Sequence, residues 1–364
     1  KKLALFTKDN RLNLSNNKDY DNYSFWEEIV RSLPHLKKLE TLQVEGLCTG
    51  QVISSDFTEH PLQKFILKAS DYKLVHIEDL KLPRTITHLE LDGVKGQFPI
   101  FTEPKFLRTL ILRRSDIHIH QGDEAKTQIA LFLEKCENLE ALILGNRFIP
   151  KDIKIPPRVK ELEIRNLQEE ACIELSFLEK EALNSLSMLK LWWIKLPKEL
   201  SFSEIESLFL HCCSNINKIE VINITKNTYP VFWIYNCNQL TDVSFPKPTG
   251  FFSLVINQCA NLQRLCLDLP SLEKECKMIK RLSLRLQNLP ALQALPFPDP
   301  QLPWNANAFG KIQFLELPSH LMFAAKVKRK LFSFEKDDKR HRYSFEISEM
   351  FLNYWNDINL LPAG

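Results

Sequence analysis

Apolar residues recur along this chain in a short unit, L-x-x-L-x-L, where L is any large apolar residue. Three consecutive segments carry this unit and align without gaps: residues 205–221, 229–245 and 251–267. In each segment a cysteine stands three positions after the unit. These cysteines, Cys213, Cys237 and Cys259, recur at steps of 24 and 22 residues. Self-similarity at a period in this range is typical of solenoid proteins.

The unit recurs on both sides of these three segments, at spacings that vary from roughly 20 to 32 residues. Its further copies are Leu36/Leu39 with Leu42/Val44, Leu62/Phe65/Leu67, Ile86/Leu89/Leu91, Leu107/Leu110/Leu112, Leu139/Leu142/Leu144, Val159/Leu162/Ile164, Leu186/Leu189/Leu191, Ile279/Leu282/Leu284 and Ile312/Leu315/Leu317. In a strand, the two residues of L-x-L point to one face and the x points to the other. Stacking the strands in parallel would bury the L face and leave the x face as a broad sheet.

Between the units, the linker length predicts what each coil carries on its other side. Ser24 and Glu27 have the spacing of a capping box that opens a helix through Phe25, Trp26, Ile29 and Val30. We expect further helices from Asp123 and around residues 169–186, where the linkers are longest. From 205 to 270 the linkers are too short for helices. There a second strand per coil is predicted at Ile219/Val221, Val243/Phe245 and Leu265/Leu267.

These features resemble the leucine-rich-repeat family over about residues 12–317. Cys136-x-Asn138, Cys213-x-Asn215 and Cys259-x-Asn261 look like the repeats of F-box adaptor subunits. Leu82-Pro83 and the Ile155-Pro156-Pro157 segment look like the short repeats of bacterial effectors injected into host cells. Because Gly is scarce (9) while Lys and Asn are frequent, we favour the effector family. The resemblance implies an α/β leucine-rich-repeat solenoid, with a curved parallel sheet on the concave side and helices, loops and short strands on the convex side.

The repeat fades beyond Leu317, so we place a solenoid over residues 1–319 and a C-terminal cap over 320–364. Terminal repeats of a solenoid need a polar outer face. A Pro-rich stretch, 290–303, is expected to form a loop across the stack. Residues 326–342 form a basic run that Asp337 and Asp338 interrupt, and we interpret it as a solvated hairpin.

The composition of the chain argues against some classes of function. The chain has 364 residues, is 44% hydrophobic and has a net charge of +3, without the basic excess of a duplex-DNA binder. No apolar run reaches the ~18–20 residues of a membrane helix. The nine cysteines are an odd number in apolar surroundings, which indicates free thiols in a reducing cytoplasm. For an effector, that compartment would be the host cytoplasm after secretion.

The x positions carry the functional prediction, because they should face water and yet several are aromatic. Trp192, Phe209, His211, Trp233 and Tyr235 fall on three consecutive strands, roughly 5 Å apart. An exposed aromatic patch marks a partner site, and the alternative is that a segment of the same chain covers it. Charged x-face residues near this patch would set specificity: Asp92, Arg113, Glu163 and Arg165.

The sequence offers little support for a catalytic site or a metal site. Cys266-Leu267-Asp268 has the letters of the Cys-x-Asp motif of bacterial leucine-rich-repeat ubiquitin ligases, but Leu267 is a repeat core position and the helical catalytic domain of that family is absent. His118-x-His120 has no partner at ligand spacing, and Cys212-Cys213 lacks the C-x-x-C pattern of a zinc site. We expect no catalytic residue, no metal and no cofactor.

The sequence therefore predicts a non-enzymatic, monomeric protein-binding module. It would be a secreted effector that docks a host protein on its concave sheet, with no nucleic-acid partner and no membrane insertion. Two alternatives stay open. One is a substrate-recognition subunit of a ubiquitin-ligase complex, whose F-box would lie before Lys1. The other is the repeat part of a ligase that lacks its catalytic domain.

Overall fold

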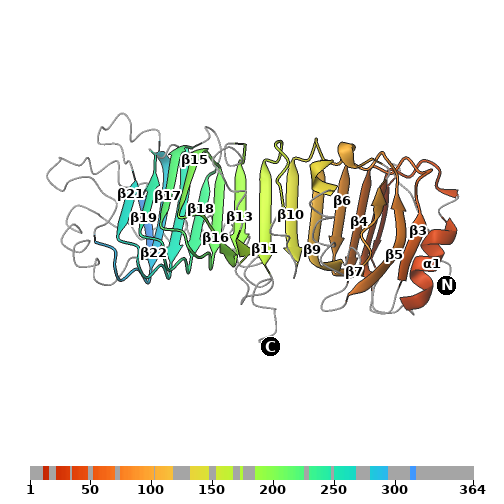
Figure 1. Cartoon of the computed structure of the whole chain (residues 1–364), viewed down its shortest axis with the longest axis horizontal. Coiled ribbons are helices and arrows are strands. Elements are labelled where there is room, and N and C mark those ends of the chain that lie inside the picture. The colour runs from red at the N-terminus through yellow and green to blue at the C-terminus, as the bar shows by residue number, and fades with distance from the viewer. Residues whose placement is uncertain are drawn as a thin grey trace, which may run out of the picture. The chain divides into compact units, whose positions relative to one another are not determined.

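The computed structural model describes residues 11–15, 22–32, 35–47, 52–69, 74–101, 103–117, 132–146, 153–166, 173–174, 185–224, 229–246, 250–267, 279–293 and 312–316. These residues form a solenoid built mostly of parallel β-sheet, in which successive strands lie side by side in chain order (Figure 1). The strands of the main sheet pair in the order β1 (Arg11–Ser15), β2 (Thr41–Leu47), β4 (Lys64–Ala69), β6 (His88–Asp92), β9 (Thr109–Ile117), β10 (Ala141–Asn146), β11 (Glu161–Asn166), β13 (Met188–Trp192), β16 (Ser207–His211), β18 (Val231–Tyr235), β20 (Gly250–Asn257), β22 (Ile279–Gln287) and β23 (Ile312–Glu316).

Several coils carry a second strand. Towards the C-terminal end, β15 (Glu199–Glu204), β17 (Lys218–Asn223), β19 (Asp242–Phe245) and β21 (Arg264–Leu267) form a parallel sheet of their own. This confirms the three second strands predicted between 205 and 270. Towards the N-terminal end, similar parallel pairings join β3 (Val52–Asp56), β5 (Val75–Leu82), β7 (Val94–Gly96) and β8 (Ile100–Phe101). In the middle of the chain, a short parallel pair joins β12 (Ile173–Glu174) to β14 (Ile194–Lys195).

Helices are few in the described ranges. The helix α1 runs from Asn22 to Ser32 and buries Trp26 and Ile29. It begins before Ser24, so the capping box predicted at Ser24 is wrong: that residue lies inside the first turn. A short 3₁₀ turn, η2, covers Pro104–Phe106. Only residues 132–134 of the helix predicted from Asp123 are described, and they are helical. Most of the helix predicted around 169–186 lies outside the described residues, but residues 173–174 within it form the strand β12, so the prediction is wrong there. The cap predicted at 320–364 lies outside the described residues.

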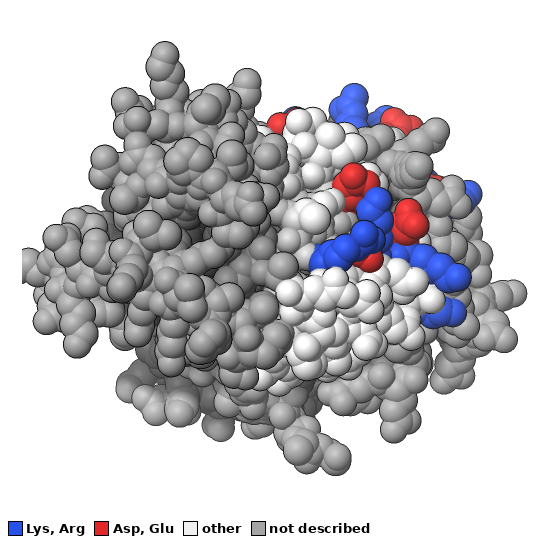
Figure 2. Space-filling view, turned by 90° about the vertical axis from the view of Figure 1, so that its left-hand side faces the viewer, with Lys and Arg blue, Asp and Glu red and all other residues white. Residues whose placement is uncertain are grey.

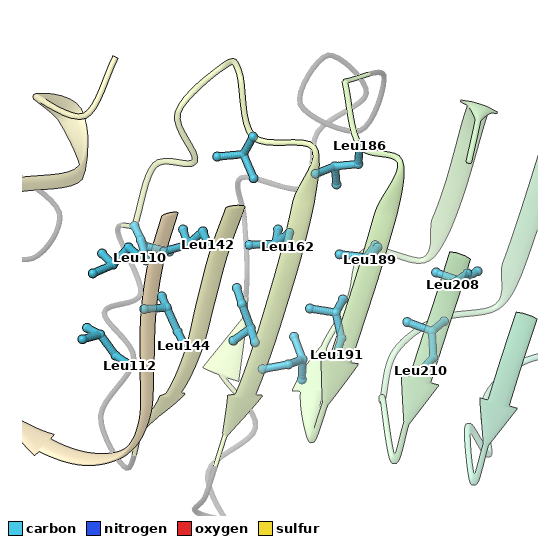
Figure 3. Packing of buried hydrophobic residues seen from close by; sticks show 14 of the residues in the cluster. Leu110, Leu112, Leu142, Leu144, Leu162, Leu186, Leu189, Leu191, Leu208 and Leu210 are labelled. Carbon is cyan, nitrogen blue, oxygen red and sulfur yellow. The ribbon is translucent and has the colours of Figure 1, made fainter. Parts of the chain in front are cut away.

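The core lies between the two sides of each coil, where the L positions stack in register. Leu110, Leu142, Leu162, Leu189 and Leu208 pair from strand to strand as one layer, and each is at most 1% exposed. A second layer follows two residues along each strand (Figure 3). Burying one such leucine side chain stabilises the fold by about 1.5–3 kcal/mol, and each leucine depends on neighbours from both adjacent coils.

Register differs from the prediction near the C-terminal end of the stack. In β22, Leu284 pairs with Leu254 and Leu286 pairs with Ile256, so the L-x-L pair is two residues later than predicted. In β23, Phe314 rather than Leu315 pairs with Leu284. The cause is a period-two run of apolar residues in β22, which presents the same face at either register.

A left-handed residue ends many of the main strands. Trp193, Cys212, Asn236 and Gln258 have φ of 53°, 51°, 52° and 56°. The backbone N–H of Cys212 donates to Tyr235 O on the next coil at 2.9 Å, and the other three make the equivalent bond. This conformation turns the chain out of the sheet and keeps the backbone paired between coils.

The small residue that follows this turn donates a hydrogen bond to a backbone carbonyl inside the coil. In three coils it is Cys213, Cys237 or Cys259, each 1% exposed or less. The Cys213 thiol donates to Leu191 O at 3.5 Å, and the other two donate to carbonyls of their own strands at 3.6 Å. A hydrogen bond with a neighbouring thiol, followed by burial, raises the pKa of Cys237 and that of Cys259. The repeated cysteine is therefore a structural hydrogen-bond donor at the turn.

Candidate binding face

The outward face of the main sheet carries two rows of side chains in strict strand-to-strand register. The first row consists of Glu45, Lys68, Asp92, Arg113, Gly145, Arg165, Trp192, His211, Tyr235, Asn257 and Gln287. The second row, two residues earlier on each strand, includes Ile66, Glu90, Ile111, Ile143, Glu163, Lys190, Phe209, Trp233 and Val255. Since neighbouring strands lie about 4.8 Å apart, each row is a continuous ladder.

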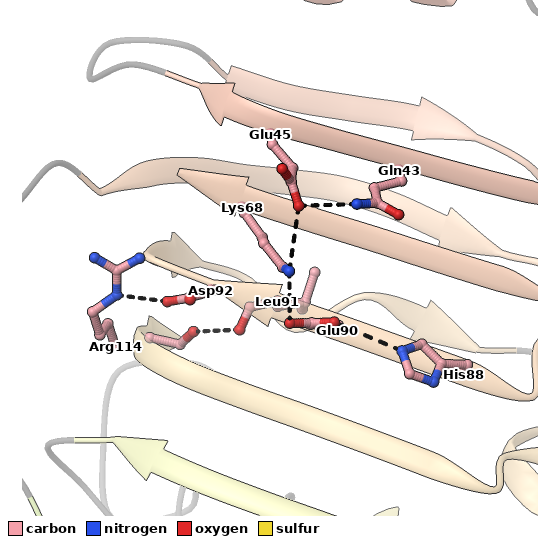
Figure 4. A network of polar contacts seen from close by, with 9 residues as sticks. Gln43, Glu45, Lys68, His88, Glu90, Leu91, Asp92 and Arg114 are labelled. Atoms are coloured by element: carbon pink, nitrogen blue, oxygen red, sulfur yellow. Dashed lines mark hydrogen bonds and ion pairs between the residues drawn. The ribbon is translucent and has the colours of Figure 1, made fainter. Parts of the chain in front are cut away.

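Charged groups pair with one another along the N-terminal part of the face (Figure 4). Lys68 Nζ lies 3.3 Å from a carboxylate oxygen of Glu45 on one side and of Glu90 on the other. Burial raises the pKa of Glu90, but the contact with His88, whose Nε2 lies 3.8 Å from a Glu90 carboxylate oxygen, and the charge of Lys68 outweigh it, so that pKa lies below its ordinary value. Asp92 accepts a hydrogen bond from Arg114 Nε at 2.7 Å. These contacts tie four consecutive strands together.

The middle of the face is rich in cations. Arg113 and Arg165 flank Gly145 in the first row, and Lys190 follows in the second. Glu163, which is 4% exposed, accepts a hydrogen bond from Arg165 Nε at 2.9 Å and lies 3.9 Å from Lys190 Nζ. Burial lowers the pKa of Lys190, Glu163 opposes that shift, and the charges of Arg165 and Arg113 add to it.

Aromatic side chains follow on the next strands and pack on each other. The ring centroids of Trp192 and Phe209 lie 4.7 Å apart, and those of Phe209 and Trp233 lie 4.2 Å apart in an edge-to-face contact. The guanidinium of Arg165 lies 4.3 Å from the centroid of the Trp192 ring, a cation–π contact that joins the cationic and aromatic parts of the face.

His211 continues this aromatic cluster. Its imidazole stacks flat on Tyr235, with centroids 4.8 Å apart and planes 3° apart, and meets Trp193 edge-on at 5.1 Å. Burial, with a smaller contribution from the charge of Arg165, lowers the pKa of His211 to about 4. The imidazole is therefore neutral at physiological pH.

The exposure predicted for the aromatic residues is wrong for four of the five. Trp192, Phe209, His211 and Trp233 are buried, with 1%, 6%, 6% and 8% of their surface exposed, whereas Tyr235 is half-buried. Wide rings on adjacent strands cover one another, and the Arg165 head group covers part of Trp192. The accessible groups on this part of the face are instead the half-buried polar side chains of Arg113, Arg165, Lys190, Tyr235 and Asn257.

Sequence reasoning found Arg113, Glu163 and Arg165 but missed two residues that belong with them. Lys190 is the middle residue of Leu189-x-Leu191 on β13, and Gly145 lies on β10 between the two arginines. Both could have been found by aligning the rows strand by strand, since Gly145 and both arginines directly follow the second apolar residue of their units.

The remaining candidates supply no second site. Cys266 is exposed on β21, between Leu265 and Leu267, which are buried as repeat core positions; Asp268 lies outside the described residues. His118 and His120, and the basic run at 326–342, also lie outside them. Across the described ranges, no group of His, Cys, Asp or Glu side chains is placed to hold a metal ion. The helices that the structure describes include none with the length and hydropathy of a membrane span.

Surface charge elsewhere is mixed. At the end of the solenoid seen in Figure 2, basic side chains lie directly beside acidic ones. On the second sheet, Arg264 pairs with Asp242, and Lys218 lies 3.2 Å from Glu220. Such exposed pairs contribute little stability and present no net charge to a partner.

Fold and face together define a parallel β-solenoid with a broad outward sheet that carries a charged half and an aromatic half. Comparison with family models, curated proteins and solved structures finds no match to this chain.

Proposed function

We propose that this chain is a non-enzymatic module that binds a protein partner on the outward face of its main sheet. The observation that carries the proposal is the alignment of half-buried polar groups along one rigid ladder, from Arg113 through Arg165 to Tyr235 and Asn257. A parallel sheet paired on both edges of each strand holds such groups in fixed positions, so little ordering entropy is lost when a partner binds. The buried rings beneath act as support for this surface.

We further propose that the coils are leucine-rich repeats. Support comes from the inward L-x-x-L-x-L residues and from the small donor that stands at the turn in the Asn or Cys position of that repeat. The second strands at β15, β17, β19 and β21 depart from the helix-backed form of the repeat. In this proposal the module works as a monomer in a reducing cytoplasm, in keeping with the free thiols of Cys136, Cys237 and Cys259.

We favour the role of a secreted bacterial effector that acts on a host protein, because Gly is scarce in this chain while Lys and Asn are frequent. A substrate-recognition subunit of a ubiquitin ligase is the second candidate, favoured by the buried cysteines at 213, 237 and 259. A subunit of that kind would be recovered together with the scaffold proteins of the ligase.

The test is a paired affinity purification from host-cell extract. One bait is the double variant Tyr235→Ala/Asn257→Ala, which alters the proposed face. The matched control is Ile222→Ala, at a residue that is 52% exposed on the second sheet. We expect a partner that the wild type and the control retain and the double variant loses. Equal recovery by all three folded proteins would refute the assignment of the face.

A further inference from the structure

The C-terminal part of the outward face is an uncharged surface of side-chain amides beside one tyrosine. This amide surface comes from the ends of β18, β20 and β22 and from the turns that follow them, and its members are half-buried or exposed: Tyr235, Asn236, Asn257, Gln258, Gln287 and Asn288. Arg285 borders it in the second row of the face. The amide surface thus differs in chemistry from the middle of the face, which is rich in cations.

Hydrogen bonds hold the amides in place and decide what they offer to a ligand. Asn288 Nδ2 donates to Asn257 Oδ1 at 3.0 Å, which joins the face to the turn beside it. Asn236 Nδ2 donates to Cys212 Sγ at 3.2 Å. The two N–H groups of Asn257 Nδ2 donate to no acceptor in the described part of the chain, and one lone pair of its oxygen is already used. Asn257 therefore offers mainly donors to a ligand.

The spacing of the strands favours one conformation for a segment that crosses them. Tyr235 on β18 and Gln287 on β22 are two strands apart, which is about 9.6 Å along the sheet. A polyproline II segment presents the same side every three residues, or about 9.3 Å. An extended β-segment repeats every two residues, or about 6.4–6.8 Å, and matches neither one strand spacing nor two. A polyproline II segment can therefore repeat its contacts along the solenoid.

The donors of the surface also suit the backbone of such a segment. Polyproline II has no internal hydrogen bonds, so its carbonyls are free to accept, and a proline has no N–H of its own to donate. An α-helix uses most of its carbonyls internally and would leave Asn257 Nδ2 without an acceptor. Tyr235 supplies an aromatic ring, the kind of group on which proline-rich segments dock.

We infer that the amide surface binds a proline-rich segment of the protein partner in the polyproline II conformation, laid across β18, β20 and β22. Asn257 Nδ2 donates to a carbonyl of the segment, and Tyr235 packs against its proline rings. The segment is preformed and the sheet is rigid, so little ordering entropy opposes binding. This inference deepens the proposed function and rests on it, because it names what the partner presents to this part of the face.

The first experiment needs no partner. A blocked oligoproline of about ten residues is titrated into the purified chain by calorimetry, with a blocked Gly–Ser peptide of the same length as the comparison. Both peptides are uncharged, but only the oligoproline is held in the polyproline II conformation. We expect saturable binding of the oligoproline and at least about ten-fold weaker binding of the flexible Gly–Ser peptide.

A matched pair of variants tests the donor at the centre of the surface. In Asn257→Asp the carboxylate still accepts the bond from Asn288 Nδ2 but has no N–H to offer. Its affinity for oligoproline should fall by at least about ten-fold, because an acceptor then faces the carbonyl of the ligand. The control is Gln263→Ala, at an exposed amide beside β21 on the second sheet, which should bind as the wild type does. Thermal unfolding of each variant verifies that it is folded.

The chain has a proline-rich stretch of its own at residues 290–303, and a further variant separates this stretch from a partner. Pro296→Ala/Pro298→Ala/Pro300→Ala removes three of its prolines. We expect this variant to bind oligoproline as the wild type does. The reason is that Gln293 N donates to Gln263 O, next to β21 on the second sheet and not on the outward face.

Three results would overturn the inference: oligoproline that binds no better than the Gly–Ser peptide, unchanged affinity in Asn257→Asp, or binding that appears only in the triple proline variant. The last would assign the surface to the chain's own stretch. The affinity purification does not depend on these titrations. If Tyr235→Ala/Asn257→Ala still loses a partner there, the binding face stands and only the segment assigned to it is wrong.

Discussion

Acid should destabilise this solenoid through one buried histidine. His211 is 6% exposed, its Nδ1 has no hydrogen-bond partner within the described ranges, and Arg165 is the cation that acts on it. Its neighbours Trp193 and Tyr235 are aromatic. A proton placed on this imidazole would therefore be buried beside a positive charge, with no acceptor at Nδ1 in the described structure.

The size of the effect follows from the pKa of His211, which is about 4 in the folded chain against an ordinary 6.5. Because the folded value is the lower one, the unfolded chain takes up the proton first as pH falls. Stability is thus complete above about pH 6.5 and is lost progressively down to about pH 4. At about pH 5 the loss attributable to His211 is about 2 kcal/mol.

The assay is urea denaturation at about pH 7.5 and pH 5, for the wild type and for His211→Phe, which keeps a ring on Tyr235 but cannot take up a proton. Carboxylates titrate in both proteins, so the difference between their two losses isolates the histidine. We expect the wild type to lose about 2 kcal/mol more than the variant. Equal losses would refute the account of a buried, neutral imidazole.

Three further changes test the structure at separate points. Glu163→Gln should lower the free energy of unfolding by about 2–4 kcal/mol, measured by urea denaturation, because it removes the buried carboxylate that pairs with Arg165. Gln258→Gly should raise the thermal midpoint and stabilise by up to about 1 kcal/mol, since a left-handed φ strains any residue with a Cβ. Cys266 should be alkylated quickly in the native protein, while Cys237 should react only on unfolding, as followed by peptide mass spectrometry.

Each of these has an internal control. Glu27→Gln breaks an exposed ion pair with Arg31 and should change stability by only about 0.5 kcal/mol or less. Gln263→Gly, at an exposed position without positive φ, should destabilise, so stabilisation by both glycines would contradict the strain argument. Fast alkylation of Cys237 in the native protein would contradict its burial, which it shares with Cys213 and Cys259.

The buried half of the fold was predictable from the sequence. Burial requires an apolar residue at every second position of each strand, and the same pattern must return once per coil. Leu208, Leu210 and Cys213 illustrate this, since each needs a small or branched partner at the same height on both neighbouring coils. Register was harder to predict. Where Leu282, Leu284 and Leu286 alternate along one strand, a slip of two residues buries the same face, and only the pairing with β20 selects the correct pair.

The exposure of the side chains on the outward face could not be predicted from the alternating pattern of apolar residues. The reason bears on where a partner would bind. Alternation states which face a side chain takes but not what covers it there. Strands about 4.8 Å apart bring wide rings such as Phe209 and Trp233 into contact with each other, so aromatic residues on adjacent strands bury one another. Arg113, Gly145 and Arg165 occupy equivalent positions of consecutive coils, so a glycine between two arginines in one row is a feature that the sequence alone can reveal.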